Sequence, residues 1–259
     1  MNLELNGISI IPVNRLPEIK PGDNLVKIIS SALTKEKIHL RNGDILAIAQ
    51  KIISKAENRI VKINNISPTS FAISLAKELD KDPKITEIIL GETKRIVKME
   101  KGKFQKGRLI VETRNGIVCA NAGVDASNVS GGDAVTLLPQ DPDGSAKRLV
   151  EGFRNELGIE IAIIITDTVG RPWRIGLTEI AIGCWGINPL KDYRGEKDSK
   201  GYELSATVVA IADEIAAAAG LVMKKTGAIP VVIVRGLKYD QGGLGAKELI
   251  RNPEEDLFR

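Results

Sequence analysis

The chain has 259 residues, of which 43% are hydrophobic and 27% are charged, with a formal net charge of +4. These values are ordinary for a soluble globular protein that is long enough to bury a substantial core. No apolar run approaches the roughly 20 residues that a membrane-spanning helix needs, and the N-terminus lacks the pattern of a signal peptide. We therefore expect a cytoplasmic protein with no membrane partner.

Cysteine and histidine are too scarce for most metal centres. Cys119 and Cys184 lie far apart, and His39 is the single histidine. The sequence therefore argues against a Cys/His zinc site and against a centre built on several histidines. Basic residues crowd residues 94–108, but Phe104 is the only aromatic residue there. This pattern favours a solvated face over a nucleic-acid surface.

The first half of the chain alternates between short strands and helices. In chain order, the expected elements are a strand over 3–13, a helix over 24–33, a strand over 45–49, helices over 70–79 and 85–97, and a hairpin over 109–113 and 117–120. The hairpin rests on Asn115-Gly116, because this dipeptide favours a turn with positive φ.

The second half continues in the same manner. Its expected elements are a strand over 134–138, a helix over 145–157, strands over 159–165 and 231–234, and between those two strands a helix over 207–223. Residues 189–203 form a long polar loop, which is unusual in a compact domain. Strands and helices mix without a strict βαβ alternation. We therefore predict a mixed α+β fold rather than a doubly wound sheet.

A carboxylate, a hydroxyl and two guanidinium groups follow the apolar run 163–165. Asp167 and Thr168 come directly after its end, and Arg171 and Arg174 lie just beyond. Ligands tend to bind outside the carboxyl ends of strands, Asp oxygens suit hard divalent cations, and Arg suits phosphate. The pattern is typical of a metal-assisted phosphate site. The alternative is that Asp167 caps a helix while both arginines lie in solvent.

Two further clusters are candidates for the same site. Asp125 and Asn128 are three residues apart, so both can face one ligand in a tight turn, although an Asx turn would give the same pattern. Lys51 and Lys55 follow a strand, where Lys55 could contact phosphate, although many such lysines are inert. No GxxxxGK[ST] loop occurs, so a bound nucleotide would need metal together with Lys and Arg.

Seven segments, taken together and in order, resemble a single family. They are SKAE (54–57), NAGVDASNV (121–129), DPDGSA (141–146), ITDTVGRPWR (165–174), DYRG (192–195), ADEIAAAAGLVM (212–223) and IPVVIVRGL (229–237). Through them the chain resembles the coenzyme F-420:L-glutamate ligases, also called F-420-0:γ-glutamyl ligases, over essentially its whole length. Its length resembles that of the stand-alone archaeal form.

The resemblance implies a GTP-dependent amide ligase. Such an enzyme adds L-glutamate to the lactyl carboxylate of the deazaflavin F-420-0 and then extends the product through γ-linked glutamates. The family resemblance also implies an α+β fold with two intertwined domains in a homodimer. We expect one ligase unit over residues 1–259, with a smaller subdomain inserted at about residues 70–200. The expected cofactors are two divalent cations, Mg²⁺ or Mn²⁺, and K⁺.

The motif match also assigns site residues. The expected metal ligands are Asp125, Asp167 and Thr168. Nucleotide-binding residues are expected at Leu16, Pro17, Glu18, Ile19, Gln50, Lys51, Lys55, Asn128, Met223, Lys224, Lys225, Thr226, Gly227, Ala228 and Ile229. Relatives often carry Gly and an acidic or amide residue after the Met. Since this chain has Lys224 and Lys225 there, its metal stoichiometry stays open.

The expected chemistry is activation of a carboxylate by phosphorylation. The substrate carboxylate attacks the γ-phosphorus of GTP, and the glutamate amine then displaces phosphate from the acyl phosphate. Metal on Asp125 and Asp167 would neutralise the developing charge, while Lys55 and Arg171 or Arg174 would orient the phosphoryl group. The alternatives are a metal-dependent ligase or phosphotransferase acting on another carboxylate, and a non-catalytic nucleotide-binding module.

Overall fold

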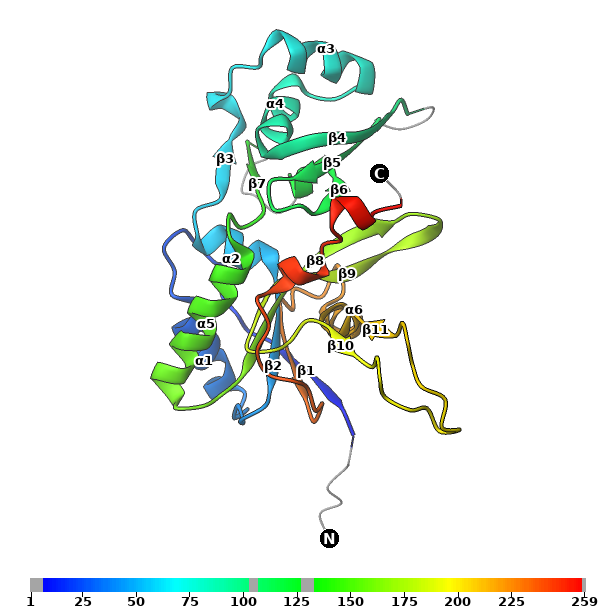
Figure 1. Ribbon diagram of the computed structural model, residues 1–259. Coiled ribbons are helices and arrows are strands. Elements are labelled where there is room, and N and C mark those ends of the chain that lie inside the picture. Colours follow the sequence, from blue (N-terminus) through cyan, green and yellow to red (C-terminus); the bar gives the residue numbers. More distant parts are fainter. Residues whose placement is uncertain (1–6, 103–106, 127–132, 258–259) are drawn as a thin grey trace.

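A five-stranded sheet forms the centre of the larger part of the molecule (Figure 1). The computed structural model describes residues 7–102, 107–126 and 133–257. Across the sheet the strands are β1 (Ser9–Val13), β12 (Val231–Arg235), β2 (Ile45–Ala49), β8 (Ala162–Arg171) and β9 (Arg174–Trp185). The neighbours β2 and β8 are parallel, and the other neighbouring pairs are antiparallel. This mixed sheet with its helices confirms the predicted α+β class.

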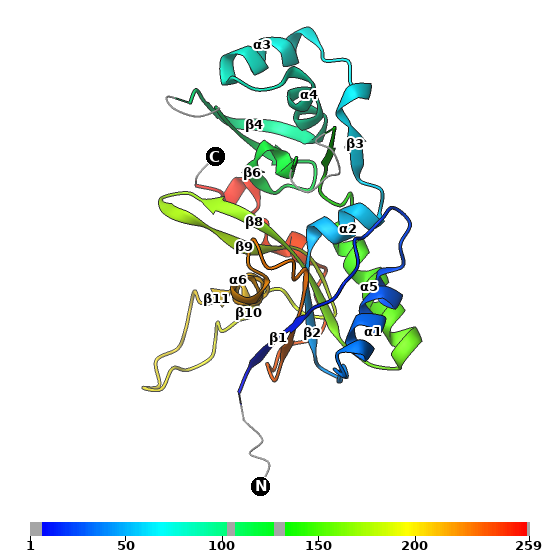
Figure 2. The ribbon, with the colours of Figure 1, turned by 180° about the vertical axis from the view of Figure 1, so that it is seen from behind.

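Helices cover both faces of this sheet (Figure 2). The helices α1 (Leu25–Lys35), α2 (Gln50–Ala56) and α5 (Pro142–Leu157) pack on one face, and α6 (Ile211–Met223) packs on the other. Along β8, Ile163 and Ile165 belong to the first core and Ile164 to the second. Successive strand residues point to opposite faces, so a strand covered on both sides must be apolar throughout.

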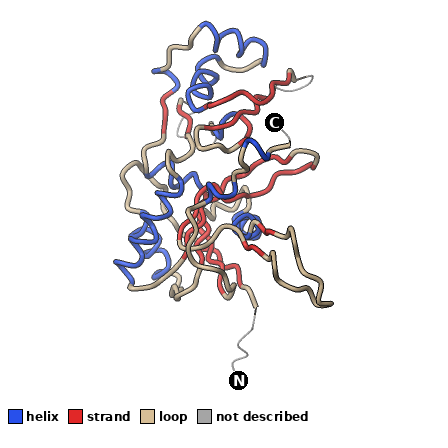
Figure 3. The backbone as a smooth tube through the Cα atoms, viewed as in Figure 1, coloured by secondary structure: helices blue, strands red, loops and turns tan. Residues whose placement is uncertain are grey.

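A smaller group of elements lies at one end of the molecule (Figures 1 and 3). It comprises β3 (Ile60–Lys62), α3 (Ser70–Leu79), α4 (Pro83–Glu92), β4 (Thr93–Glu100), β5 (Arg108–Thr113), β6 (Val118–Ala120) and β7 (Ala134–Thr136). Leu79, Ile89 and Leu109 are among the buried residues of its own hydrophobic core. The exact division of the chain into domains stays a prediction.

Short elements complete the chain. The strands β10 (Lys191–Asp192) and β11 (Val208–Val209) pair at the base of the long polar loop. Single helical turns occur at Ile63–Asn65, Asn121–Gly123, Ala246–Leu249 and Pro253–Glu255. Within the described ranges, no helix has both the length and the apolar character to cross a membrane.

Several predicted elements match the structure closely, whereas the helix predicted over 85–97 is wrong in its second half. The ranges 45–49 and 70–79 coincide with β2 and α3. The helix α4 begins at Pro83 with Asp82 as its N-cap and ends at Glu92, and β4 starts at Thr93. Beyond Glu92 the chain pairs with β5 instead, because β-branched residues such as Thr93 favour a strand once a partner strand is available.

The strand β8 does not end at Ile165, as the sequence pattern predicts. It pairs with β2 only as far as Ala49 and Thr166, and then continues with β9 as a two-stranded hairpin. The register of the β8–β9 pair shifts between Ile165 and Thr166, which is typical of a β-bulge beside a functional site. Asp167 and Thr168 therefore lie where β8 loses one of its two neighbouring strands.

The glycine that ends α5 has a left-handed backbone conformation, which a substitution can test. Gly158 has φ 68° and ψ 25°, and an added Cβ there would meet no atom within 4 Å. Gly158→Ala should therefore lower the free energy of unfolding by about 1–2 kcal/mol through backbone strain alone.

The matched control is Gly91→Ala inside α4, where an added Cβ also meets no atom within 4 Å. This change should raise the free energy of unfolding by about 0.5–1 kcal/mol, because alanine loses less conformational entropy in a helix. Urea unfolding of both variants measures the two effects. Equal losses at both positions would contradict the assigned backbone geometry.

Candidate active site

A cavity of about 1060 Å³ opens beside the point where β8 loses contact with β2. Its walls come from the segment before α1, the start of α2, the hairpin strands β8 and β9, and the segment after α6. The smaller group of elements contributes Asp125, which follows β6. The cavity thus lies between the central sheet and the smaller group.

Most residues predicted for the site line this cavity. They are Leu16, Pro17, Glu18, Ile19, Gln50, Lys51, Lys55, Asp125, Asp167, Thr168, Met223, Lys224, Lys225, Ala228 and Ile229. Thr226 and Gly227 lie in the same segment but are not among the lining residues. The predicted nucleotide contact Asn128 lies outside the described residues. The roles of all these residues stay predictions.

The two predicted arginines do not line the cavity. Arg171 and Arg174 lie at the exposed turn of the β8–β9 hairpin, which projects from the body of the molecule in both views (Figures 1 and 2). The guanidinium of Arg171 donates to the carbonyl oxygen of Ile175 at 3.4 Å. The hairpin tip also exposes Trp173, whose accessibility is 78% of its maximum. Because β8 continues past Asp167, the arginines are carried away from the carboxylate.

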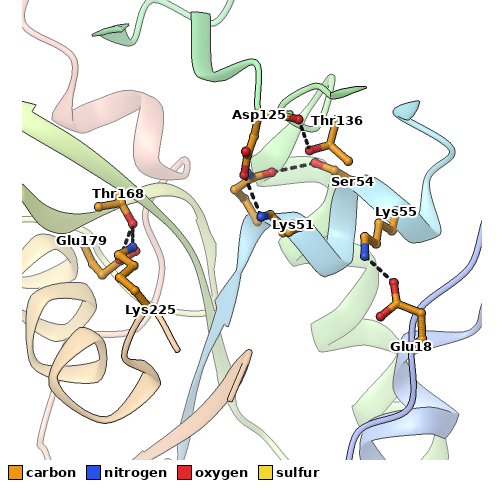
Figure 4. A network of polar contacts seen from close by, with 10 residues as sticks. Glu18, Lys51, Ser54, Lys55, Asp125, Thr136, Thr168, Glu179 and Lys225 are labelled. Carbon is orange, nitrogen blue, oxygen red and sulfur yellow. Dashed lines mark hydrogen bonds and ion pairs between the residues drawn. The ribbon is translucent and has the colours of Figure 1, made fainter. Parts of the chain in front are cut away.

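Two lysines of α2 form ion pairs on one side of the cavity (Figure 4). The ammonium of Lys51 lies 2.7 Å from a carboxylate oxygen of Asp125, and Lys55 pairs with Glu18. The backbone of Asp125 is held by two hydrogen bonds with Thr136, of 2.8 and 3.0 Å. The backbone of Asp125 is thus anchored while its carboxylate faces the cavity beside a lysine.

The opposite side carries a second polar cluster (Figure 4). The hydroxyl of Thr168 donates to Glu179 Oε1 at 2.5 Å, and the ammonium of Lys225 lies 2.8 Å from the same oxygen. Lys225 also donates to Thr168 Oγ1. The sequence reasoning missed Glu179. Glu179 lies directly opposite Thr168 in the β8–β9 hairpin. A sequence analysis that had predicted this hairpin would therefore have identified Glu179.

Asp167 carries a strongly perturbed carboxyl group at the cavity. Burial raises its pKa from 3.8 to about 6, and repulsion from Glu179 and Asp125 adds to this effect. A hydrogen bond from the Thr168 backbone and the charge of Lys225 act in the opposite direction. Burial and the charge of Asp167 also raise the pKa of the Cys119 thiol, to about 12. Cys119 is therefore an unreactive thiol at neutral pH.

The donor set suits a hard divalent cation, although the described residues hold no preformed centre. In the described part of the chain, no three Asp, Glu, His or Cys side chains converge in the manner of a metal site. The cavity does supply carboxylate and hydroxyl oxygens, the ligands that Mg²⁺ and Mn²⁺ prefer. Burial, together with repulsion from Glu179 and Asp125, raises the pKa of Asp167, so a cation beside this carboxylate would be electrostatically favoured.

A second cavity, of about 550 Å³, lies among α1, α2 and α5. Two of its charged groups pair with each other, because Arg148 lies 2.7 Å from Glu57, and Ser145 donates to the same carboxylate at 2.5 Å. None of the predicted site residues lines it. The larger cavity is therefore the candidate active site.

The fold and the cavity define an α+β protein whose main cleft combines carboxylates and lysines from segments far apart in sequence. Residues 14–236 match the family model described as F420-0:Gamma-glutamyl ligase. The chain belongs to this family.

Three curated relatives from archaea cover nearly the whole chain, and each is named coenzyme F420:L-glutamate ligase. The protein of Methanothermobacter thermautotrophicus is 44% identical over 98% of this chain and 99% of its own length. That of Methanopyrus kandleri is 42% identical over 97% of both chains, and that of Methanocaldococcus jannaschii is 43% identical over 94% of both. The similarity therefore extends over both groups of elements that border the cavity.

Proposed function

We propose that this chain is a GTP-dependent ligase that adds L-glutamate, through γ-linkages, to the lactyl carboxylate of the deazaflavin F-420-0. GDP and phosphate are the by-products, and the reaction takes place in the cytoplasm. The family match over residues 14–236, together with near-complete coverage by relatives bearing that name, supports the proposal. The observation that carries it is one cavity that collects the matched motif residues from distant segments.

The proposed reaction has two steps, phosphorylation of the substrate carboxylate and attack by the glutamate amine. An oxygen of the substrate carboxylate forms a bond to the γ-phosphorus of GTP while the bond to the β,γ-bridging oxygen breaks, which gives an acyl phosphate and GDP. The amine of glutamate then attacks the acyl carbon, phosphate leaves, and the amine loses a proton. Activation is needed because a carboxylate is a poor electrophile at neutral pH.

The lysines of α2 are the groups we assign to the phosphates. Lys51 and Lys55 line the cavity and now pair with Asp125 and Glu18. An ammonium is a compact charge that suits phosphate oxygens. On nucleotide binding, we expect both lysines to exchange these carboxylates for phosphate. That exchange would leave Asp125 available to a cation.

We assign Asp125, Asp167 and Thr168 to divalent cations, Mg²⁺ or Mn²⁺, with K⁺ as a further cofactor. When bound, the divalent cation would neutralise charge on the phosphoryl oxygens. The chain's own contribution is to hold two carboxylates at the same cavity, one from β8 and one from the segment after β6. Both are preorganised, because one lies in a paired strand and the other in a hydrogen-bonded bridge.

We further propose that the chain forms a homodimer through the β8–β9 hairpin. Its tip exposes Trp173, Ile175 and Leu177 together, and such an exposed apolar group is typical of an interaction site. Arg171 and Arg174 do not reach the cavity of their own chain. Docking of the hairpin on a second copy is the arrangement in which they would act on phosphate. Light scattering of the purified chain and of a Trp173→Ser variant tests this association.

Mass spectrometry of the deazaflavin product tests the ligase proposal. The chain is incubated with F-420-0, GTP, L-glutamate, Mn²⁺ and K⁺. We expect mass increments of one or more glutamyl residues, with none when GTP is omitted. GDP release without a glutamyl increment would favour a phosphotransferase or a ligase for another carboxylate. Tight GTP binding without any product would favour a non-catalytic nucleotide-binding module.

A further inference from the structure

The ammonium of Lys225 lies among oxygen atoms that could otherwise serve a metal ion. It is 2.8 Å from Glu179 Oε1 and also donates to Thr168 Oγ1. The Glu179 side chain retains only 12% of its accessible surface, whereas that of Lys225 retains 66%. A long side chain thus reaches from solvent and places its charged end on a nearly buried carboxylate.

The backbone before Lys225 is shaped for this placement. The helix α6 ends at Met223, and Lys224 follows with φ 51° and ψ 166°. A non-glycine residue with positive φ is uncommon, so the surrounding structure has to hold it. This turn brings the segment after α6 to the wall of the cavity beside the hairpin. Both lysines line the cavity, but the contact to Thr168 and Glu179 belongs to Lys225.

The two ends of the cavity have similar charge arrangements. Asp125 is paired with Lys51, and Glu179 is paired with Lys225. Asp167 lies within the electrostatic influence of Asp125, Glu179 and Lys225. At the Glu179 end, the ammonium uses the lone pair of the Thr168 hydroxyl, while the hydroxyl proton is donated to Glu179. A divalent cation needs the same oxygen lone pairs, and two cations cannot share them without strong repulsion.

We propose that Lys225 is a tethered cation that takes the place of a second divalent ion, so that this chain binds one divalent ion per site, on Asp125 and Asp167. The inference rests on the proposed function. It assigns Lys225 as a residue that determines metal stoichiometry. Because the ammonium is part of the chain, its charge is present before nucleotide and metal arrive.

The test counts Mn²⁺ ions bound per chain in the presence of GDP, from the electron paramagnetic resonance signal of free Mn²⁺. The full-length wild-type chain should bind one ion. Lys225→Met should bind two, with the second at least about tenfold tighter than any second ion on the wild type. The control Lys238→Met removes the same charge at an exposed position that does not line the cavity, and it should still bind one ion. Lys225→Gln provides a second variant with a polar side chain.

The double variant Lys225→Met, Glu179→Gln locates the added ion. It should return to one ion, because the carboxylate that would hold the second has been removed. Two ions on the wild type would overturn the inference while leaving metal-dependent ligation intact. One ion on both Lys225 variants would also overturn it. Absence of Mn²⁺ binding in every variant would overturn both this inference and the proposed metal dependence, whereas glutamyl transfer is tested separately by product mass.

Discussion

Asp167→Asn should reduce GTP-dependent glutamyl transfer by about 30- to 1000-fold, the equivalent of about 2–4 kcal/mol in the barrier. Asp167 is a largely buried carboxylate at the wall of the cavity, at the point where β8 loses its contact with β2. The amide keeps the shape of the side chain but cannot carry the negative charge that the proposed cation needs. The loss should therefore appear in turnover rather than in folding.

Steady-state turnover at saturating GTP, over a range of Mn²⁺ concentrations, measures this effect. Asp192→Asn is a matched control, because Asp192 is exposed, pairs with Arg194 at 2.6 Å and does not line the cavity. The control should keep wild-type turnover. An Asp167→Asn protein with full metal-dependent turnover would remove Asp167 from the catalytic site.

The central sheet was predictable because its strands are buried on both faces. Such strands are continuously apolar, so residues 45–49 stand out in any reading of the sequence, and β2 occupies those residues. The helix over 70–79 was predictable for a different reason. Thr69 is its N-cap, with the side chain accepting a hydrogen bond from the backbone of Ala72, and such caps are local signals. Both elements are specified by residues close in sequence.

The errors occur where distant pairing decides the structure. Residues 93–97 could continue α4 on local grounds, but they pair with β5, which lies further along the chain. Likewise, the polar residues after Ile165 look like the end of a strand. They continue as β8 only because β9 provides a partner as far as Arg171. Propensity is a weak predictor when tertiary pairing competes with it.

The distinction between local signals and distant pairing also applies to the candidate active site. Family motifs nominate Asp125, Asp167 and Thr168, and the structure places all three on one cavity. Glu179 has no distinctive local motif and becomes visible only through its pairing with Thr168 across the hairpin. The arginines at the hairpin turn show the converse case. Closeness in sequence to Asp167 suggested closeness in space, but an extended strand carries residues apart at about 3.3 Å per residue.

The free energy of unfolding should decrease as the pH rises from about 4 to about 6, because of Asp167. Its pKa is about 6 in the folded chain and 3.8 in the unfolded chain. Between these values the unfolded carboxyl has lost its proton while the folded one keeps it, so rising pH favours unfolding. Below pH 4 both are protonated and there is no penalty. Above pH 6 the penalty is complete, at about 3 kcal/mol for a shift of this size.

Asp167→Asn removes the cost of ionising this buried carboxyl. At neutral pH the same substitution should therefore stabilise the metal-free protein while it removes most of the activity. In chelator, the variant should exceed the wild type by about 3 kcal/mol at pH 8 and by progressively less as the pH falls toward 4. Urea unfolding at several pH values measures the difference. Asp192→Asn is the control, since hydrogen bonds from Arg194 hold the pKa of Asp192 at about 2, below this range. Its difference from the wild type should stay constant between pH 4.5 and 8. A constant difference for Asp167→Asn would mean that its carboxylate is not desolvated, and the electrostatic argument for a cation at Asp167 would fail with it.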